Sequence, residues 1–333
     1  MNLLLIYTNQ LSINYNKILI IKSFYKNLDL YEKNNIKIDE LIIYDISDFN
    51  YLDFSKYKNY IFWLHQKIGS YILTIPNYID LIKKNNIKTI FWMDDLHYPC
   101  NNLTNEDRLD KEALNNDFRY NNANLIVSPS IDYFYNVGSK LINKSKFLFY
   151  YFDENIINNY NPINFDKRIS KILLSGKINN LSYKSRKQIY TNYFNNNQLF
   201  DYLEHPGYKT LKHKVYHNNF YNKLSEYKGA ILGLGCYPIN FLLAKVIEIL
   251  GSGCIGFFEE SELYFKRLNL IENIHYISIK KNENNLVFDN KKFENIINSE
   301  FGKQISKNGY NFIKDNFNSK TFSKKIISIL YEL

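Results

Sequence analysis

The segment spanning residues 229–259 constrains the fold of this chain more than any other. An apolar run at residues 229–234 leads into a turn that ends at Pro238, and from residue 239 to 250 the apolar side chains recur with helical spacing. Residues 254–258 form a second short apolar run. A strand, a turn, a helix and a second strand make a right-handed βαβ unit with parallel strands. The segment therefore predicts an α/β fold.

The same alternation of short apolar runs and helix-length segments extends over most of the chain. It predicts strands at residues 3–7, 40–46, 60–64, 88–93, 124–128, 146–152, 171–175, 199–203 and 275–279. This pattern is typical of a doubly wound, mostly parallel sheet. At 333 residues, the chain has room for two α/β domains of about 150 residues each.

The domain boundaries follow from a polar, asparagine-rich stretch in the middle of the chain. We expect an N-terminal Rossmann-like domain at residues 1–155 and a linker at residues 156–169, which contains Pro162. A second Rossmann-like domain should occupy residues 170–318, followed by a C-terminal helix at residues 319–333.

Two charged residues interrupt the apolar face of the central helix. Lys245 and Glu248 are three residues apart, so they should project from the same side. Free backbone N–H groups at a helix N-terminus suit a phosphate, and a carboxylate further along suits ribose hydroxyls. The pair therefore indicates a site for a nucleoside diphosphate that carries a sugar. An ordinary ion pair on a surface helix is the alternative interpretation.

The pattern K-x-x-E-I-L-G-S-G-C-I-G-F-F that begins at Lys245 resembles the donor-site helix of GT-B glycosyltransferases. It is most similar to enzymes related to glycosyltransferase family 4, including their spore-maturation-like branch. Glu248 matches the second, ribose-binding glutamate of that family, but Asn240 stands where the first glutamate is expected. The strand end at Trp92 and residues 123–130 also resemble segments of these enzymes. The resemblance implies two Rossmann-like domains that face each other across a cleft, with residues 319–333 packing back on the first domain.

The resemblance also implies a donor site in the second domain. A base after its first strand should face the donor diphosphate, because the leaving nucleoside diphosphate gains negative charge. Lys177 is the first choice, and His205 is a candidate for stacking on the nucleobase. Alternatively, the lysines are simply solvated at the surface, and His205 lies in an ordinary turn without a role in binding. The predicted donor-binding residues are Gly176, Lys177, Lys184, Arg186, His205, Tyr237, Pro238, Ile239, Asn240, Lys245 and Glu248.

Polar residues in the first half follow predicted strands, and ligands gather at the carboxyl ends of parallel strands. We therefore predict that His65 and Asp94 bind the acceptor and that Asp95 and His97 are candidates for a catalytic base. Alternatively, Asp94 or Asp95 caps the loop after the strand, and His97 is a loop histidine with its hydrogen bonds satisfied. A metal site at Asp94, Asp95 and His97 is disfavoured, because adjacent residues of an extended segment point to opposite faces.

Composition narrows the class of partner and the compartment. The net charge of +9 comes from scattered lysines without a dense basic stripe, so we do not predict nucleic-acid binding. Cys100, Cys236 and Cys254 lie far apart, which favours reduced thiols and a cytoplasmic protein over a disulfide framework or a zinc site. No apolar run reaches the roughly eighteen residues that would span a bilayer, although peripheral membrane contact remains compatible with the sequence.

These features together predict a nucleotide-sugar-dependent glycosyltransferase of the hexosyltransferase type. The resemblance implies a metal-independent, retaining reaction without a bound cofactor. The donor would be a UDP-, GDP- or other NDP-sugar, and the acceptor a glycan, a lipid or a protein. Two alternatives stay open, a catalytically silent sugar- or nucleotide-binding module, which Asn240 favours, and a nucleotide-sugar epimerase of the same architecture.

Overall fold

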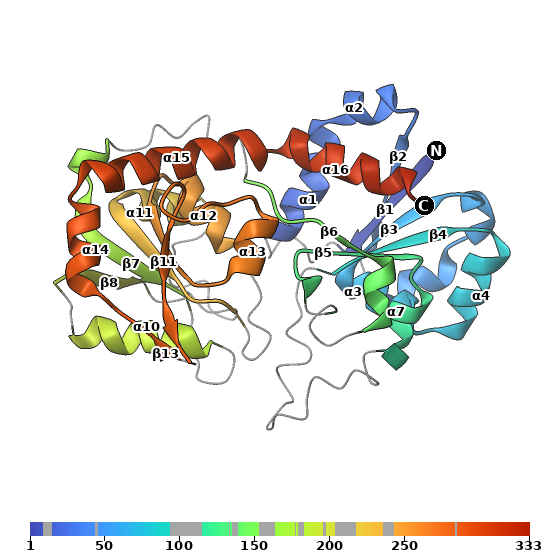
Figure 1. The fold of residues 1–333 in the computed structure, drawn as a ribbon. Coiled ribbons are helices and arrows are strands. Elements are labelled where there is room, and N and C mark those ends of the chain that lie inside the picture. The colour runs from blue at the N-terminus through green and yellow to red at the C-terminus, as the bar shows by residue number, and fades with distance from the viewer. Residues whose placement is uncertain are drawn as a thin grey trace. The chain divides into compact units, whose positions relative to one another are not determined.

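The computed structural model describes the chain at residues 1–8, 15–43, 46–93, 115–132, 134, 139–152, 164–176, 178, 183–195, 198–203, 218–235, 243–283 and 285–333. The chain divides into two compact units. Unit 1 consists of Met1–Tyr150 and Ser319–Leu333, and unit 2 consists of Tyr151–Asn318. Figure 1 shows that each unit has a central sheet with helices packed against it.

Unit 1 is built on a six-stranded sheet with the order β2-β1-β3-β4-β5-β6, and all neighbouring strands are parallel. Its strands are β1 (Asn2–Thr8), β2 (Lys37–Ile43), β3 (Ile61–His65), β4 (Lys88–Trp92), β5 (Leu125–Ser128) and β6 (Ser145–Phe147). Its helices are α1 (Tyr15–Lys26), α2 (Leu28–Lys33), α3 (Gln66–Ile72), α4 (Pro76–Lys84), α7 (Phe118–Asn122) and α16 (Ser319–Tyr331). The central strands β3 and β5 are buried throughout, as expected for a parallel sheet that is covered on both faces.

Unit 2 is built on a five-stranded parallel sheet with the order β11-β10-β9-β7-β8. Its strands are β7 (Ile169–Ser175), β8 (Phe200–Leu203), β9 (Tyr227–Leu232), β10 (Ile255–Glu259) and β11 (Ile277–Ile279). Its helices are α10 (Lys184–Asn195), α11 (Asn218–Ser225), α12 (Lys245–Gly251), α13 (Glu262–Arg267), α14 (Asn290–Ile297) and α15 (Glu300–Asn316). An antiparallel hairpin, β12 (Lys281–Asn282) and β13 (Asn285–Leu286), follows β11.

The two parallel sheets confirm the predicted fold class of two doubly wound α/β domains. In unit 2 the chain passes from β7 to β8 on one side and then to β9 on the other side of β7. The carboxyl ends of β7 and β9 therefore meet at a topological switch point, which is where open α/β sheets bind ligands.

The predicted start of the central helix of unit 2 differs from the structure. The helix expected from residue 239 begins at Lys245, and Leu243 and Ala244 precede it. Apolar spacing marks the buried face of a segment and does not show where helical hydrogen bonding starts. Helices α1 and α2 are separated at Asn27, whose side-chain amide donates to the Ser23 carbonyl at 2.9 Å and to Ser319 Oγ at 3.2 Å.

Helix α16 lies against α1 and α2 within unit 1, although it follows the whole of unit 2 in the sequence (Figure 1). Ser323 Oγ donates to the Ser23 carbonyl at 3.2 Å, and the Tyr331 hydroxyl donates to the Asn34 carbonyl at 2.8 Å. The Phe322 ring meets Trp92 edge-on, with 6.4 Å between ring centroids. The last helix therefore completes the packing of the first unit.

Arg168 joins three segments at the amino-terminal edge of the unit 2 sheet. Its side chain is buried, and Nη1 donates to the carbonyls of Tyr227, Ser252 and Gly253. Gly253 has φ = +69°, and a Cβ there would lie 2.9 Å from Arg168 Nη2. The guanidinium thus fixes the turn between α12 and β10 relative to β9.

Replacing Arg168 should destabilise the protein because these buried carbonyls would lose a charged donor. We expect Arg168→Met to lower the free energy of unfolding by about 2 to 3 kcal/mol in a urea titration of the full chain. Lys167 is exposed and adjacent, so Lys167→Met is the matched control and should change the free energy of unfolding by less than about 0.5 kcal/mol. Equal effects of the two substitutions would contradict this account.

Candidate functional site

The candidate site lies at the switch point of unit 2, where Gly176 directly follows β7. Gly176 has φ = +108°, a conformation that residues with a side chain rarely adopt. Its N–H donates to the Leu203 carbonyl at 3.3 Å, and its own carbonyl accepts from the Tyr202 hydroxyl at 3.1 Å. These bonds hold the turn against the end of β8.

Two cationic side chains approach Gly176 from different helices. A Cβ on Gly176 would lie 2.9 Å from Arg186 Nη1 and 3.1 Å from Lys245 Nζ. Arg186 is in the first turn of α10, and Lys245 is the first residue of α12. The glycine leaves room for both groups, so the switch point gathers two positive charges. Arg186 and Lys245 are called the cation pair below.

Each member of the cation pair contacts an aromatic ring. The Arg186 guanidinium lies over the Tyr183 ring, 4.0 Å from its centroid, and Lys245 Nζ lies 5.1 Å from the centroid of Phe220. Lys245 Nζ also donates to Ser175 Oγ at 2.9 Å. Arg186 is only 4% exposed, so its charge is largely removed from water. Contacts of this kind orient the two cations and partly offset their desolvation.

The charges at this site perturb one another. Burial and, to a smaller extent, the positive charge of Arg186 lower the pKa of Lys245 to about 7, while the charge of Glu248 opposes the shift. Burial raises the pKa of Glu248, and the charge of Lys245 opposes that shift. An anion placed between the cations would relieve their repulsion and favour the protonated form of Lys245.

Lys245 and Glu248 share one side of α12. Both are partly exposed, whereas the intervening and following residues Val246, Ile247, Ile249 and Leu250 are buried. The Glu248 carboxylate therefore lies on the same face of α12 as Lys245, about one turn further along. This arrangement can take an anionic group beside Gly176 and a hydroxyl-bearing group beside Glu248.

Of the predicted donor-binding residues, the structure brings Gly176, Arg186 and Lys245 together. Glu248 lies on the same face of α12 as Lys245. Lys184 is half-buried at the start of α10, two residues before Arg186. The remaining predicted donor residues lie outside the described part of the chain, namely Lys177, His205, Tyr237, Pro238, Ile239 and Asn240. Among the predicted acceptor and catalytic residues, Asp94, Asp95 and His97 also lie outside it.

His65 is the only predicted residue of unit 1 that lies within the described part of the chain. It ends β3, pairs in register with Trp92 of β4, and is 2% exposed. The structure thus places it at the carboxyl edge of the sheet, in a buried position. Among the described residues, no group of three or more His, Cys, Asp or Glu side chains is arranged to hold a metal ion.

Three contact residues of the site were not predicted from the sequence. Ser175 had a usable signal, since it is the polar last residue of a buried strand. Tyr183 and Phe220 had none, because aromatic residues make up 17% of the chain and their positions follow no motif.

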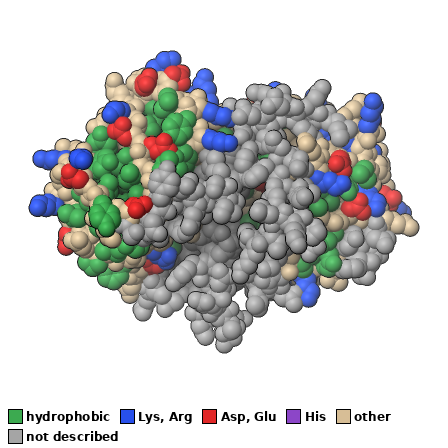
Figure 2. All heavy atoms as spheres, turned by 180° about the vertical axis from the view of Figure 1, so that it is seen from behind, with side chains coloured by type: hydrophobic (Ala, Val, Ile, Leu, Met, Phe, Trp, Pro, Cys, Tyr) green, Lys and Arg blue, Asp and Glu red, His purple; other side chains and the backbone are tan. Residues whose placement is uncertain are grey.

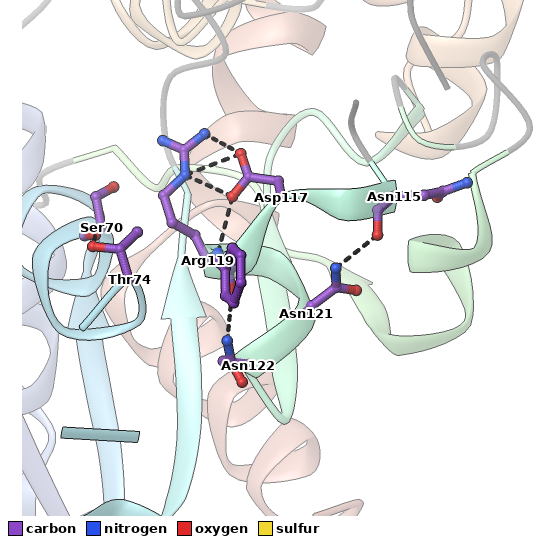
Figure 3. Close-up of polar contacts among 8 residues, drawn as sticks. Ser70, Thr74, Asn115, Asp117, Arg119, Asn121 and Asn122 are labelled. Carbon is purple, nitrogen blue, oxygen red and sulfur yellow. Dashed lines mark hydrogen bonds and ion pairs between the residues drawn. The ribbon is translucent and has the colours of Figure 1, made fainter. Parts of the chain in front are cut away.

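Other polar clusters are better explained by local structure. Figure 3 shows Asp117 and Arg119 at α7, where the Asp117 carboxylate accepts from both the backbone N–H and the guanidinium of Arg119. In the same view Asn121 donates to the Asn115 carbonyl at 2.7 Å. These bonds cap and hold a short helix that leads into β5. On the face shown in Figure 2, described basic and acidic side chains are interspersed.

Comparison with known proteins relates the fold to glycosyltransferases. No family model matches the chain, and no curated protein matches it in sequence. The solved structure of HepE from Anabaena with UDP-glucose is similar, with 11% identity, a TM-score of 0.52 and all of both chains covered. Sucrose-phosphate synthase from Thermosynechococcus elongatus has 10% identity and a TM-score of 0.58, covering 100% of this chain and 98% of its own.

An alpha-glucosyltransferase in complex with UDP and a mismatched 13-mer DNA has 10% identity and a TM-score of 0.62, covering 99% of this chain and 100% of its own. These likenesses extend over both units and confirm the GT-B fold implied by the motif resemblance. At such identities they show the fold alone. No helix among the described residues is long and apolar enough to cross a membrane.

The cation pair predicts an unusual titration. Lys245 should lose its proton near pH 7, well below the usual value for a lysine. Arg186→Gln should raise the pKa of Lys245 by removing a neighbouring positive charge, and Glu248→Gln should lower it by removing a negative one. Carbon-13 NMR of lysine labelled at Cε measures the pKa of Lys245 in each protein, and the Lys245→Met variant assigns its signal. A wild-type Lys245 signal that titrates near pH 10 would contradict the description of the site.

The lowered pKa of Lys245 also makes the stability of the protein depend on pH. The unfolded chain holds the Lys245 proton up to about pH 10, whereas the folded chain releases it near pH 7. Between these values the unfolded state binds more protons, so this group makes the free energy of unfolding rise with pH. The wild type should gain more stability between pH 7 and pH 9 than Lys245→Met does in parallel urea titrations.

Proposed function

We propose that this chain is a glycosyltransferase that transfers a sugar from a nucleotide-sugar donor to an acceptor. The observation that carries the proposal is the convergence of Arg186 and Lys245 beside Gly176 at the switch point of unit 2. Two fixed cations match the charge of a diphosphate, and this edge of a parallel sheet is where such ligands bind. The GT-B fold also supports a glycosyltransferase function.

In this mechanism the cation pair stabilises the leaving group. As the glycosidic bond breaks, negative charge develops on the nucleoside diphosphate, and Arg186 and Lys245 are held in place to receive it. Lys245 gains a full positive charge on donor binding, because the anion raises its pKa. The protein thereby supplies the charge that a metal ion would otherwise provide, so we propose a metal-independent reaction.

Glu248 would hold the ribose, since its carboxylate lies on the same face of α12 as Lys245 and can accept hydrogen bonds from hydroxyl groups. Gly176 leaves the space in which both cations come together, beside which the diphosphate would bind, and Lys184, two residues before Arg186, would add charge at the rim. Retention of configuration follows from the resemblance to family 4 and remains part of the proposal, as does the relation to its spore-maturation-like branch.

The acceptor side depends on the sequence resemblance alone. His65 and Asp94 remain predicted acceptor-binding residues, and Asp95 and His97 remain candidates for the base. The acceptor would be a glycan, a lipid or a protein, and a cytoplasmic location remains a prediction from cysteine usage. HepE and the alpha-glucosyltransferase were solved with UDP-glucose or UDP, which makes uridine nucleotides the first donors to test.

Nucleotide binding tests the donor site directly. UDP should raise the melting temperature of the wild type by mass action, and isothermal titration should give its Kd. Lys245→Met and Arg186→Gln should each weaken both UDP and inorganic pyrophosphate by about tenfold or more, because each removes a charged hydrogen-bond donor. Glu248→Gln should weaken UDP but leave pyrophosphate binding unchanged, since pyrophosphate has no ribose.

Lys280→Met is the matched control, because Lys280 pairs with Glu260 and Glu272 away from the cation pair and should leave both affinities unchanged. If no UDP, GDP, ADP or CMP derivative stabilises the wild type, the proposal is wrong. Binding without sugar release from any donor would identify a silent binding module. Conversion of the donor sugar to its epimer without an acceptor would identify an epimerase.

A further inference from the structure

A buried acid outside the cation pair joins three segments of unit 2. Glu259 is the last residue of β10 and is 1% exposed. Its Oε2 accepts from the Leu234 N–H at 2.6 Å, and its Oε1 forms an ion pair with Lys281 Nζ at 2.6 Å. A carboxylate is retained in the interior only when it is paired and hydrogen-bonded, and both oxygens of Glu259 meet this condition. The side chain thus links β10, the chain just beyond β9, and the hairpin that begins with β12.

The backbone that Glu259 holds lies directly against the helix that carries Arg186. Leu234 follows Gly233, and a Cβ on Gly233 would lie 2.9 Å from Ser185 Cβ and 3.0 Å from the Arg186 backbone nitrogen. The carboxyl end of β9 and the first turn of α10 are therefore in close contact without an intervening side chain. A shift of one requires a shift of the other.

The hairpin that supplies Lys281 also contacts α10. Leu286 N–H donates to Gln188 Oε1 at 3.0 Å, and Gln188 Nε2 donates to Asn285 Oδ1 at 3.0 Å. Gln188 is two residues from Arg186 on the same helix. The beginning of α10 is thus supported by the end of β9, which Glu259 holds, and by the hairpin, which Lys281 connects back to Glu259.

We infer that Glu259 is a positioning residue that, together with Lys281, holds Arg186 in place for the donor diphosphate. The inference rests on the proposed function, since it assigns a further residue to the same site. When only a fraction of molecules has the binding-competent arrangement, the apparent Kd is the intrinsic Kd divided by that fraction. Loss of the ion pair would let the end of β9 and the start of α10 occupy other positions. Donor affinity would then fall, whereas turnover at saturating donor would be retained.

Matched pairs of substitutions test this role. Glu259→Gln keeps the shape of the side chain and removes its charge, and Lys281→Met removes the partner cation. We expect each to raise the Kd of UDP and the donor KM by about tenfold, with kcat changed by less than about twofold, because the fraction of competent molecules is reduced. The double variant should lose far less than the product of the two single effects, because both remove the same ion pair.

The control is the neighbouring pair of the same chemistry. Glu260 and Lys280 are ion-paired at 2.9 Å, but their side chains are 42% and 55% exposed, and the Glu260 carboxylate does not hold the Leu234 N–H. Glu260→Gln and Lys280→Met should leave the Kd of UDP and the donor KM within about twofold of wild type, as expected for an exposed pair.

The possible results separate the inference from the proposed function. A wild type that binds no nucleotide would overturn both. A wild type that binds UDP, with Glu259→Gln and Lys281→Met showing a lower melting temperature but an unchanged Kd, would overturn only the positioning role. If Glu259→Gln fails to fold, Lys281→Met and Gln188→Ala decide, because both weaken the support of α10 and leave the Glu259 side chain and its bond to the Leu234 N–H in place. Unchanged UDP affinity in these two variants would overturn the inference.

Discussion

The repulsion between a buried cation, Arg186, and a half-buried one, Lys245, is the interaction on which the site in unit 2 depends. Arg186 and Lys245 approach the same glycine, and burial together with the charge of Arg186 lowers the pKa of Lys245. Such an arrangement is unfavourable in the empty protein, and it persists because the surrounding structure holds each group in place. Ser175, Tyr183, Phe220 and Glu248 partly offset the cost. An anion placed between the two cations would remove this repulsion as well as adding contacts.

Parallel sheets explain why these groups meet. Every crossover connection returns the chain to the same edge, so residues that follow β7, β9 and β10 gather there although they are far apart in sequence. Gly176 follows the first of these strands, Leu234 the second, and Glu259 ends the third. The polar edge is joined to a densely packed interior, in which one face of the sheet buries side chains such as Ile172, Ile231 and Phe257 against α10 and α14. The rigid sheet supplies the fixed positions that the charges require.

The sequence predicts the parts of this structure that depend on local pattern. Apolar runs marked the strands of both sheets, and the βαβ unit around Glu248 followed from a change of period. The predicted start of α12 was wrong, because the apolar residue Leu243 continues the helical spacing but precedes the helix. Arg186 was found through its place in a resembling segment, but its contact with Lys245 depends on tertiary structure. Glu259 reads in the sequence as one of several acids after a strand, and only the bond to Leu234 distinguishes it.

The position of α16 has a consequence for how the protein is made. This helix packs on α1 and α2, yet its residues are synthesised after the whole of unit 2. Domains generally fold as they emerge from the ribosome, with the N-terminal one first. Unit 1 can complete its packing only after α16 has been synthesised, because Phe322 of this helix covers the indole of Trp92. The described strands and helices of unit 2 are all synthesised before α16, so unit 2 can fold before unit 1 is complete, and a nascent chain exposes an uncovered apolar surface on unit 1 until α16 has been made.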